Sequence, residues 1–317
     1  MTLRVLDAAA VDSALDFPAL IDALEAAFAG RIEVPVRHHH EIKRGGENFA
    51  THLLMPAWTS GQEPAFLGTK VVNVFPGNGA KGLPSIHGTY LLMSGETGAP
   101  LAAMDGARLT AWRTAAASAL ASRFLSRADS SHLLMIGAGA LAPFFIRAHL
   151  AVRPVKTVTL WNRRREASEN LTRELSGLKA DIRIAEDRGA AIAEADIISC
   201  ATLSKTPLIE GRWLKPGAHA DCAGAYRPDM RETDDDVIRR ARLFCDTRTG
   251  ALKEGGDLAM PLANGVIKPE EVEADLLELC RKTVTFARAP GDITFFKSVG
   301  TAIEDLAAAM LVWSKTA

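Results

Sequence analysis

Three small residues, Gly137, Gly139 and Ala142, follow the apolar run 133–136 at the spacing Gly-x-Gly-x-x-Ala, and a helix-compatible segment continues to residue 152. Between a strand and a helix, this spacing allows a tight turn, a close approach of the backbone to a diphosphate, and close helix packing. The diphosphate then lies on the free N–H groups at the helix N-terminus. The sequence therefore predicts a dinucleotide site formed by Gly137, Ala138, Gly139, Ala140 and Leu141.

A basic cluster follows the next apolar run, 157–161, where Asn162 precedes Arg163 and Arg164. In an NAD site this position usually carries a carboxylate that accepts from the ribose 2′-hydroxyl. A carboxylate would repel a 2′-phosphate, whereas guanidinium groups pair with it. The cluster therefore predicts NADPH, with NADH less favoured. The alternative is a solvated basic start to the next helix. Thr202, which follows another apolar run, is a further predicted cofactor contact.

Two cations lie within apolar sequence, Lys70 in a strand-like run and Arg113 in an alanine-rich helical one. A cation held against a core needs a partner, and a bound carboxylate is one. The alternatives are that Lys70 lies on the polar side of an edge strand and that Arg113 forms a structural pair with Asp105 or Glu96. These residues alone predict an oxidoreductase for an anionic substrate.

Arg44, beside the Gly-Gly pair 45–46, and His87 are further candidates. Arg44 would add a third cation, and His87 would donate a proton near neutral pH. The alternatives are a solvated charge and a histidine satisfied by its neighbours. The run of three histidines at 38–40 lies in strand-like sequence, where alternate side chains point to opposite faces, so we expect no metal site there.

The bulk composition excludes several classes of protein. The 317 residues have a formal net charge of -1, 24% charged and 48% hydrophobic residues, so nothing indicates a nucleic-acid or membrane partner. No signal peptide and no membrane span are visible. The four cysteines lack a Cys-x-x-Cys spacing, which predicts reduced thiols of a cytoplasmic protein. The length predicts two domains.

The first part of the chain must supply a sheet that positions Lys70. We expect a helix at 17–31, capped by Asp16, and a long helix at 109–125. Short turns between the strand-like runs predict an antiparallel or mixed sheet. We expect its strands at 34–42, 49–55, 65–74, 88–93 and 101–104.

From residue 131 onward strands and helices alternate, which predicts a Rossmann-type doubly wound parallel sheet with a second, α+β domain for substrate and dimerisation. A last helix is expected at 300–315. The expected domains are 1–127 with 297–317, and 128–296. We expect the parallel strands at 133–136, 157–161, 182–185, 197–201, 219–222 and 242–245.

Several motifs in a fixed order resemble the ornithine cyclodeaminase/mu-crystallin family over nearly the whole chain. These segments are 68–78, 104–118, 136–139, 161–163, 224–232 and 298–309. The resemblance implies a homodimer whose first domain includes the C-terminal helix. It also implies that Lys70, Arg113 and Arg44 hold a substrate carboxylate.

The same resemblance places Ser85, Tyr226, Gly300 and Thr301 in the substrate site and Val299 beside the nicotinamide. The proton donor to an imine nitrogen is then His87, or a water held by Ser85 or Asp305.

One residue of this chain differs from the pattern of the cyclodeaminase branch of this family. Cyclodeaminases carry a carboxylate for the substrate amine where this chain has Tyr226. Together with the arginine cluster, this difference predicts a ketimine reductase that converts Δ1-pyrroline-2-carboxylate or Δ1-piperideine-2-carboxylate to L-proline or L-pipecolate. The alternatives are an ornithine cyclodeaminase or alanine dehydrogenase of the same fold, or a ligand-binding protein like mu-crystallin without enzymatic activity.

Overall fold

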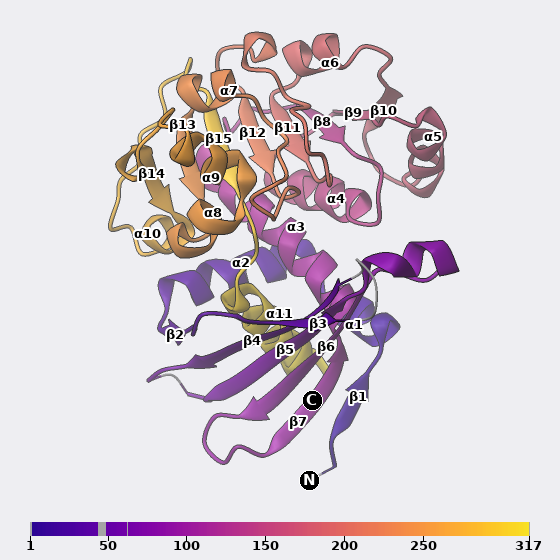
Figure 1. The fold of residues 1–317 in the computed structure, drawn as a ribbon, viewed down its shortest axis with the longest axis vertical. Helices are drawn as coiled ribbons and strands as arrows, with labels where there is room; N and C mark the ends of the chain where they lie inside the picture. Colours follow the sequence, from indigo (N-terminus) through magenta and orange to yellow (C-terminus); the bar gives the residue numbers. More distant parts are fainter. Residues whose placement is uncertain (1, 44–48, 62, 317) are drawn as a thin grey trace. The chain divides into compact units, whose positions relative to one another are not determined.

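The computed structural model describes residues 2–43, 49–61 and 63–316, which form two compact units (Figure 1). Unit 1 comprises Met1–Arg113 and Thr301–Ala317, and unit 2 comprises Thr114–Gly300. The division falls inside helix α3 (Gly106–Leu125) rather than after it at residue 127. The sequence-based boundary followed the polar stretch that ends this helix, and such a stretch does not reveal where long-range contacts change.

Unit 1 contains a seven-stranded mixed sheet in the order β1-β7-β6-β5-β4-β2, with β3 also paired to β4. Only β1 runs parallel to its neighbour β7, and the other pairs are antiparallel. The strands are β1 (Arg4–Leu6), β2 (Ile32–Glu33), β3 (His38–Lys43), β4 (Phe49–Thr59), β5 (Phe66–Val74), β6 (Ile86–Ser94) and β7 (Pro100–Asp105).

The predicted strands of unit 1 therefore exist, with three differences. β1 and β2 were missed because strands of three and two residues are too short to show a pattern, and 34–37 are not part of a strand. The turn expected at 45–46 and the candidate Arg44 lie outside the described residues.

Helices α1 (Ala8–Ala14), α2 (Phe17–Ala29) and α11 (Ala302–Thr316) belong to unit 1 with the short 3-10 helix η1 (Pro76–Lys81). Asp16 caps α2 as predicted, by accepting from the N–H of Ala19 at 2.9 Å. α11 contacts β4, β5, β6 and α2. It therefore brings the end of the chain onto the same face of the sheet as Lys70.

Unit 2 contains an eight-stranded sheet in the order β10-β9-β8-β11-β12-β15-β13-β14, and all its pairs are parallel. The prediction of a Rossmann-type sheet is confirmed. The strands are β8 (His132–Ile136), β9 (Thr157–Trp161), β10 (Asp181–Ile184), β11 (Ile197–Cys200), β12 (His219–Cys222), β13 (Arg242–Cys245), β14 (Val272–Asp275) and β15 (Thr294–Lys297).

Two strands of unit 2 were not predicted. β14 contains Glu273 and Asp275, and β15 ends on Lys297, so neither shows the plain apolar run of a buried strand. β14 is the strand at one end of the sheet. β15 lies between β12 and β13, so its side chains meet residues far away in the sequence.

Helices connect the strands of unit 2, so the carboxyl ends of all eight strands lie at one edge, where ligands bind in such sheets. Within the described part of the chain, no helix has the length and apolar character needed to cross a membrane. All four cysteines are buried, and none forms a disulfide within the described residues. The helices are α4 (Ala142–Val152), α5 (Arg165–Glu174), α6 (Arg188–Glu194), α7 (Asp235–Arg240), α8 (Arg248–Glu254), α9 (Gly256–Ala263) and α10 (Leu276–Cys280), with 3-10 turns η2 (Gly211–Trp213) and η3 (Pro269–Glu271).

Candidate functional site

The glycine loop between β8 and α4 has the geometry of a diphosphate-binding turn. Gly137 has a φ of +103°, and a Cβ atom there would lie 3.0 Å from the carbonyl oxygen of Ala201. A Cβ atom on Gly139 would meet nothing within 4 Å, so this backbone borders open space. α4 begins at Ala142 with Leu141 as its N-cap, and no side chain caps it. The loop and its flanking residues Ala138 and Ala140 therefore fit a nicotinamide dinucleotide.

The basic cluster after β9 lies at the surface of unit 2. Arg163 and Arg164 are exposed, and within the described residues neither guanidinium forms an ion pair. Arg165, in contrast, pairs with Glu169 and Glu186 at 3.1 Å each. The Asn162 amide donates to the carbonyl of Arg164 at 3.0 Å and shapes this loop. The arrangement leaves two guanidinium groups for an anion.

Lys70 and Arg113 converge on one carboxylate in unit 1. Lys70 Nζ lies 2.9 Å and Arg113 Nε lies 3.0 Å from the same oxygen, Oδ1 of Asp305. Lys70 Nζ is also 2.8 Å from Oδ2 of Asp305. Lys70 is 2% exposed, Arg113 5% and Asp305 0%. The predicted cations are thus brought together, in an ion cluster around Asp305.

Glu304 is the second carboxylate of this cluster and pairs with Arg113 at 2.5 Å. The partners considered for Arg113 from the sequence, Asp105 and Glu96, were wrong, because α11 returns from the far end of the chain to supply Glu304 and Asp305. Such a contact between residues 191 positions apart leaves no local signal.

Burial and the neighbouring Arg113 lower the pKa of Lys70 to about 8, although Asp305 and Glu304 act in the opposite direction. Tyr90, the register partner of Lys70 on β6, is fully buried beside it. Its hydroxyl has no hydrogen-bond partner within the described residues, and burial raises its pKa. Lys70 therefore exchanges its proton far more readily near neutral pH than an exposed lysine.

Arg37 is a further cation near this cluster, and sequence reasoning missed it. Its positive charge, after those of Lys70 and Arg113, helps to lower the pKa of Asp305. The segment around it is not a strand, and its charge has no distinctive spacing. Arg44 lies outside the described residues, so its role in carboxylate binding stays a prediction.

The structure does not bring His87 to Lys70. In β6, His87 and Tyr90 are three residues apart and therefore point to opposite faces of the sheet. His87 pairs in register with Asn73, on the other face from Lys70, and is exposed. Ser85 precedes β6 and is half-buried. A catalytic role of either residue stays a prediction.

Asn73 and His87 line a surface hollow of about 460 Å³ with Phe75 and Asn78. The histidine run is on β3 as expected. The ring centroids of His38 and His40 are 6.3 Å apart, as expected for alternate residues on one face. Among the described residues no group of three or more His, Cys, Asp or Glu side chains has the geometry to hold a metal.

The remaining candidates follow the strands of unit 2 or lie at its end. Tyr226 follows Ala225, whose φ is +45°, in the loop after β12. Val299 and Gly300 are held by Asp246, whose Oδ2 accepts from both backbone N–H groups at 2.7 Å. Asp246 was not predicted because a single buried carboxylate has no sequence signature.

Thr202 follows β11, and its methyl group lies 3.1 Å from where a Cβ of Gly137 would be. Thr301 begins the second segment of unit 1 and is buried ahead of α11. The loop candidates of unit 2 thus lie at the edge where its strands end, as predicted.

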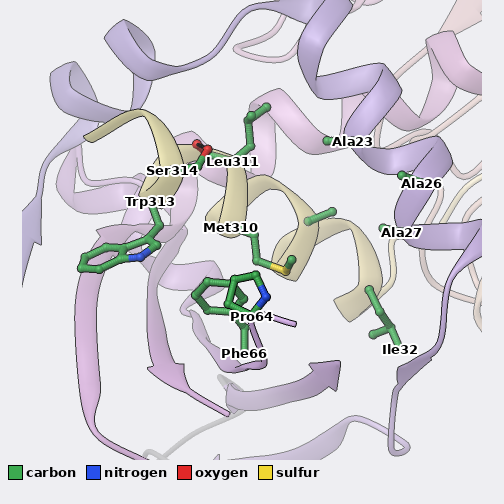
Figure 2. Close-up of a pocket in the computed structure, with 11 residues that line it drawn as sticks. Ala23, Ala26, Ala27, Ile32, Pro64, Phe66, Met310, Leu311, Trp313 and Ser314 are labelled. Atoms are coloured by element: carbon green, nitrogen blue, oxygen red, sulfur yellow. Dashed lines mark hydrogen bonds between the residues drawn. The ribbon is translucent and has the colours of Figure 1, made fainter. Parts of the chain in front are cut away.

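A cavity of about 550 Å³ between α2 and α11 is a different kind of site. Figure 2 shows its lining, to which α11 contributes Met310 and Trp313 and α2 contributes small alanines. Among the described residues, no charged side chain lines it. It therefore does not fit an anionic substrate.

A sequence model of the ornithine cyclodeaminase/mu-crystallin family matches residues 2–317. The chain belongs to this family. It is 39% identical to a Δ1-pyrroline-2-carboxylate reductase of Colwellia psychrerythraea, covering 99% of this chain and 100% of that one. It is also similar to the structure of Thermococcus litoralis Δ1-pyrroline-2-carboxylate reductase with NADH and L-proline, with 32% identity, a TM-score of 0.90 and coverage of 99% and 97%.

A third similar structure is an archaeal alanine dehydrogenase dimer with bound NAD, at 29% identity and a TM-score of 0.91, covering 99% of this chain and 96% of that one. These similarities confirm the predictions of the family, of its dinucleotide-binding fold and of an oxidoreductase that uses a nicotinamide cofactor.

Proposed function

We propose that this chain reduces five- and six-membered cyclic ketimines that carry a 2-carboxylate, with NADPH as the reductant. The products would be L-proline from Δ1-pyrroline-2-carboxylate and L-pipecolate from Δ1-piperideine-2-carboxylate. The observation that carries the proposal is the convergence of Lys70 and Arg113 on one oxygen of Asp305. Two cations that both reach one carboxylate oxygen of the protein also suit the oxygens of a substrate carboxylate.

In this mechanism the carboxylate of the imino acid binds to Lys70, Arg113 and Arg37, and Asp305 keeps the first two in place. A carboxylate fixed in this way orients C2 of the ring, and such orientation supplies part of the rate enhancement. Nicotinamide, when bound to unit 2, supplies the hydride for C2. Lys70 supplies the proton for the ring nitrogen, since its pKa of about 8 suits an acid at neutral pH. One imine, one proton and one NADPH give one cyclic amino acid and one NADP⁺.

Tyr226 supports reduction over cyclodeamination. A diamino acid brings a second ammonium group, and a site for it needs an anion where this chain has a phenol. In unit 2, Tyr226 is half-buried in the loop after β12. This loop offers a hydroxyl and an aromatic ring to the substrate, which suit an apolar ring better than a second charge.

The direct test is oxidation of NADPH in the presence of each cyclic imino acid, followed by the absorbance of the nicotinamide. We expect rapid oxidation with both ring sizes. Release of ammonia from ornithine or alanine, without imine reduction, would instead identify a cyclodeaminase or an alanine dehydrogenase. Nucleotide binding without turnover of any of these substrates would identify a ligand-binding protein.

The NADPH preference is tested by Arg163→Asp. The new carboxylate would repel the 2′-phosphate and accept from the 2′-hydroxyl of NADH, so KM for NADPH should rise about 10–100-fold. KM for NADH should fall or stay constant. The matched control is Arg165→Asp, because Arg165 already pairs with Glu169 and Glu186. An unchanged NADPH/NADH ratio in Arg163→Asp would remove this loop from cofactor selection.

We also propose that the chain forms a homodimer through the face of the unit 1 sheet opposite Lys70. Strand alternation places Leu91, Val5 and Trp58 on that face, and they are 36%, 79% and 38% exposed. Apolar rows of this kind mark an interface. The similar alanine dehydrogenase is described as a dimer, which favours a second copy of this chain as the occupant. The four reduced, buried cysteines fit the cytoplasm as its compartment.

Leu91→Asp tests this interface. Leu91 lies between Thr69 and Ala103 in register, so a carboxylate there would be buried without a partner in the dimer. We expect sedimentation velocity to show a monomer at concentrations where the wild type is a dimer. Leu83→Asp, at an exposed leucine outside the sheet, is the control and should remain dimeric. A dimeric Leu91→Asp variant would place the interface elsewhere.

A further inference from the structure

A group of fully buried charges joins the loops that follow the strands of unit 2. Lys297 is the last residue of β15 and lies in register with Cys222 of β12 and Cys245 of β13. Its ammonium group is 2.9 Å from Oδ2 of Asp257 in α9, and it also donates to the carbonyl of Gly224. One side chain thus holds both the loop after β12 and the helix α9.

Asp257 extends this connection with its other oxygen. Oδ1 accepts from the backbone N–H groups of Glu232 and Thr233, at 2.8 Å each, and from the hydroxyl of Thr233 at 3.0 Å. Glu232 is therefore fixed at its backbone by a carboxylate that Lys297 neutralises. A buried charge with this many hydrogen bonds is costly to rearrange.

The side chain of Glu232 reaches the loop after β11. Its Oε1 accepts from the backbone N–H of Thr202 at 2.6 Å and from the Thr202 hydroxyl at 2.8 Å. The two loops approach closely at Gly224, where a Cβ atom would lie 2.0 Å from the Thr202 carbonyl and 2.5 Å from Glu232 Oε1. Glu232 is thus the group that fixes both the backbone and the side chain of Thr202.

Thr202 in turn lies against the glycine loop. Its Cγ2 methyl is 3.1 Å from the Cβ position of Gly137, whose positive φ forms the turn before α4. A shift of Thr202 by a few tenths of an ångström would therefore press on this turn or open a gap beside it. The contacts run without interruption from Lys297 and Asp257 through Glu232 and Thr202 to Gly137.

We propose that Glu232 is a positioning residue for the nicotinamide nucleotide: its carboxyl group, fixed by Asp257 and Lys297, holds Thr202 against the glycine loop so that the loop is ready for the diphosphate. This inference rests on the nucleotide site proposed for unit 2. It adds a residue that is not itself expected to touch the nucleotide.

The protonation state of the Glu232 carboxyl group decides which substitution resembles the native side chain most closely. Burial raises its pKa to about 7, against the effect of the Lys297 charge. The other titratable groups that face it are Asp257, Cys200 and Cys222. Near neutral pH the protonated, neutral carboxyl is therefore well populated, and glutamine, which keeps an accepting oxygen, resembles this form.

The test compares Glu232→Ala with Glu232→Gln in the full-length protein, using NADH as the probe and the fluorescence of its nicotinamide as the readout. We expect Kd for NADH to rise at least about tenfold in Glu232→Ala, since two hydrogen bonds to Thr202 are lost. Glu232→Gln should remain within about threefold of the wild type because its amide oxygen still accepts from Thr202. Thr202→Val, which removes only the hydroxyl, should give an intermediate rise.

The control is Asp196→Asn. Asp196 is a buried carboxylate of the same unit, but it accepts from the N–H groups of Ser131 and His132 at the other ends of the strands. This variant should lower Tm and leave Kd for NADH unchanged. It therefore separates a general loss of stability from an effect on the glycine loop.

A Glu232→Ala protein with a lower Tm but the wild-type Kd would overturn the inference, because Glu232 would then only stabilise the fold. An equal loss of NADH affinity in Glu232→Gln and Glu232→Ala would also overturn it. The same holds for a loss of NADH affinity in Asp196→Asn as large as that in Glu232→Ala. If Glu232→Ala does not fold, an unchanged Kd in Thr202→Val overturns it. A wild-type protein that binds neither NADH nor NADPH would instead overturn the proposed function itself.

Discussion

Lys70→Met should lower kcat for imino acid reduction by about 10²–10⁴-fold, the range for loss of a general acid. KM for the imino acid should rise as well, because a contact to its carboxylate is lost. Methionine keeps most of the apolar stem of lysine, so the variant tests the ammonium group rather than the packing. Because Lys70 belongs to unit 1 and the nucleotide groups belong to unit 2, Kd for NADPH should stay nearly constant.

The control for Lys70→Met is His87→Gln. His87 points to the opposite face of the sheet, so its loss should change neither kcat nor the pH profile. A Lys70→Met enzyme with the wild-type rate would remove Lys70 from the mechanism. A His87→Gln enzyme that loses both its rate and the pH dependence would return the proton donor to His87, as the sequence analysis had allowed.

The features that sequence reasoning found are those with a local cause. β8, β11 and β13 are short, mainly apolar runs because a parallel sheet is covered on both faces. The spacing of Gly137 and Gly139 follows from one turn and one nucleotide contact. The family resemblance added the order of these motifs along the chain.

The features that could not be predicted from the sequence depend on contacts between residues that are far apart in the chain. Asp305 and Glu304 lie in an alanine-rich helix at the end of the chain, and only the fold shows that they neutralise Lys70 and Arg113. His87 was a reasonable acid by residue type, but strand register places it on the opposite face. Register follows from pairing between strands, which single-strand patterns do not specify.

The ion cluster also explains why a buried lysine is retained in unit 1. Two cations without carboxylates would be expelled or deprotonated in a core. Asp305 and Glu304 allow Lys70 to stay buried with a pKa of about 8, between that of an exposed lysine and that of an isolated buried one. The same pair of carboxylates therefore sets both the stability of the site and its acidity.

Asp305→Asn should destabilise unit 1 by about 3–5 kcal/mol, because it removes one partner from a buried ion cluster. Burial raises the pKa of Asp305, but Lys70 and Arg113 outweigh this effect and lower it overall. A lowered carboxyl pKa in the folded state gives stability that is present at neutral pH and lost as pH falls through and below its unfolded value of about 4. Urea unfolding of both proteins should therefore show a difference that shrinks toward pH 3.

The same variant should change the pH profile of the enzyme. The Asp305 charge raises the pKa of Lys70, so its removal should lower that pKa below about 8. The alkaline fall of kcat/KM, which reports the free enzyme, should then move to lower pH. Asp181→Asn, in an exposed pair with Arg183, is the control and should leave both stability and profile nearly unchanged. An Asp305→Asn enzyme whose alkaline limb stays at the wild-type pH would show that the limb does not report Lys70.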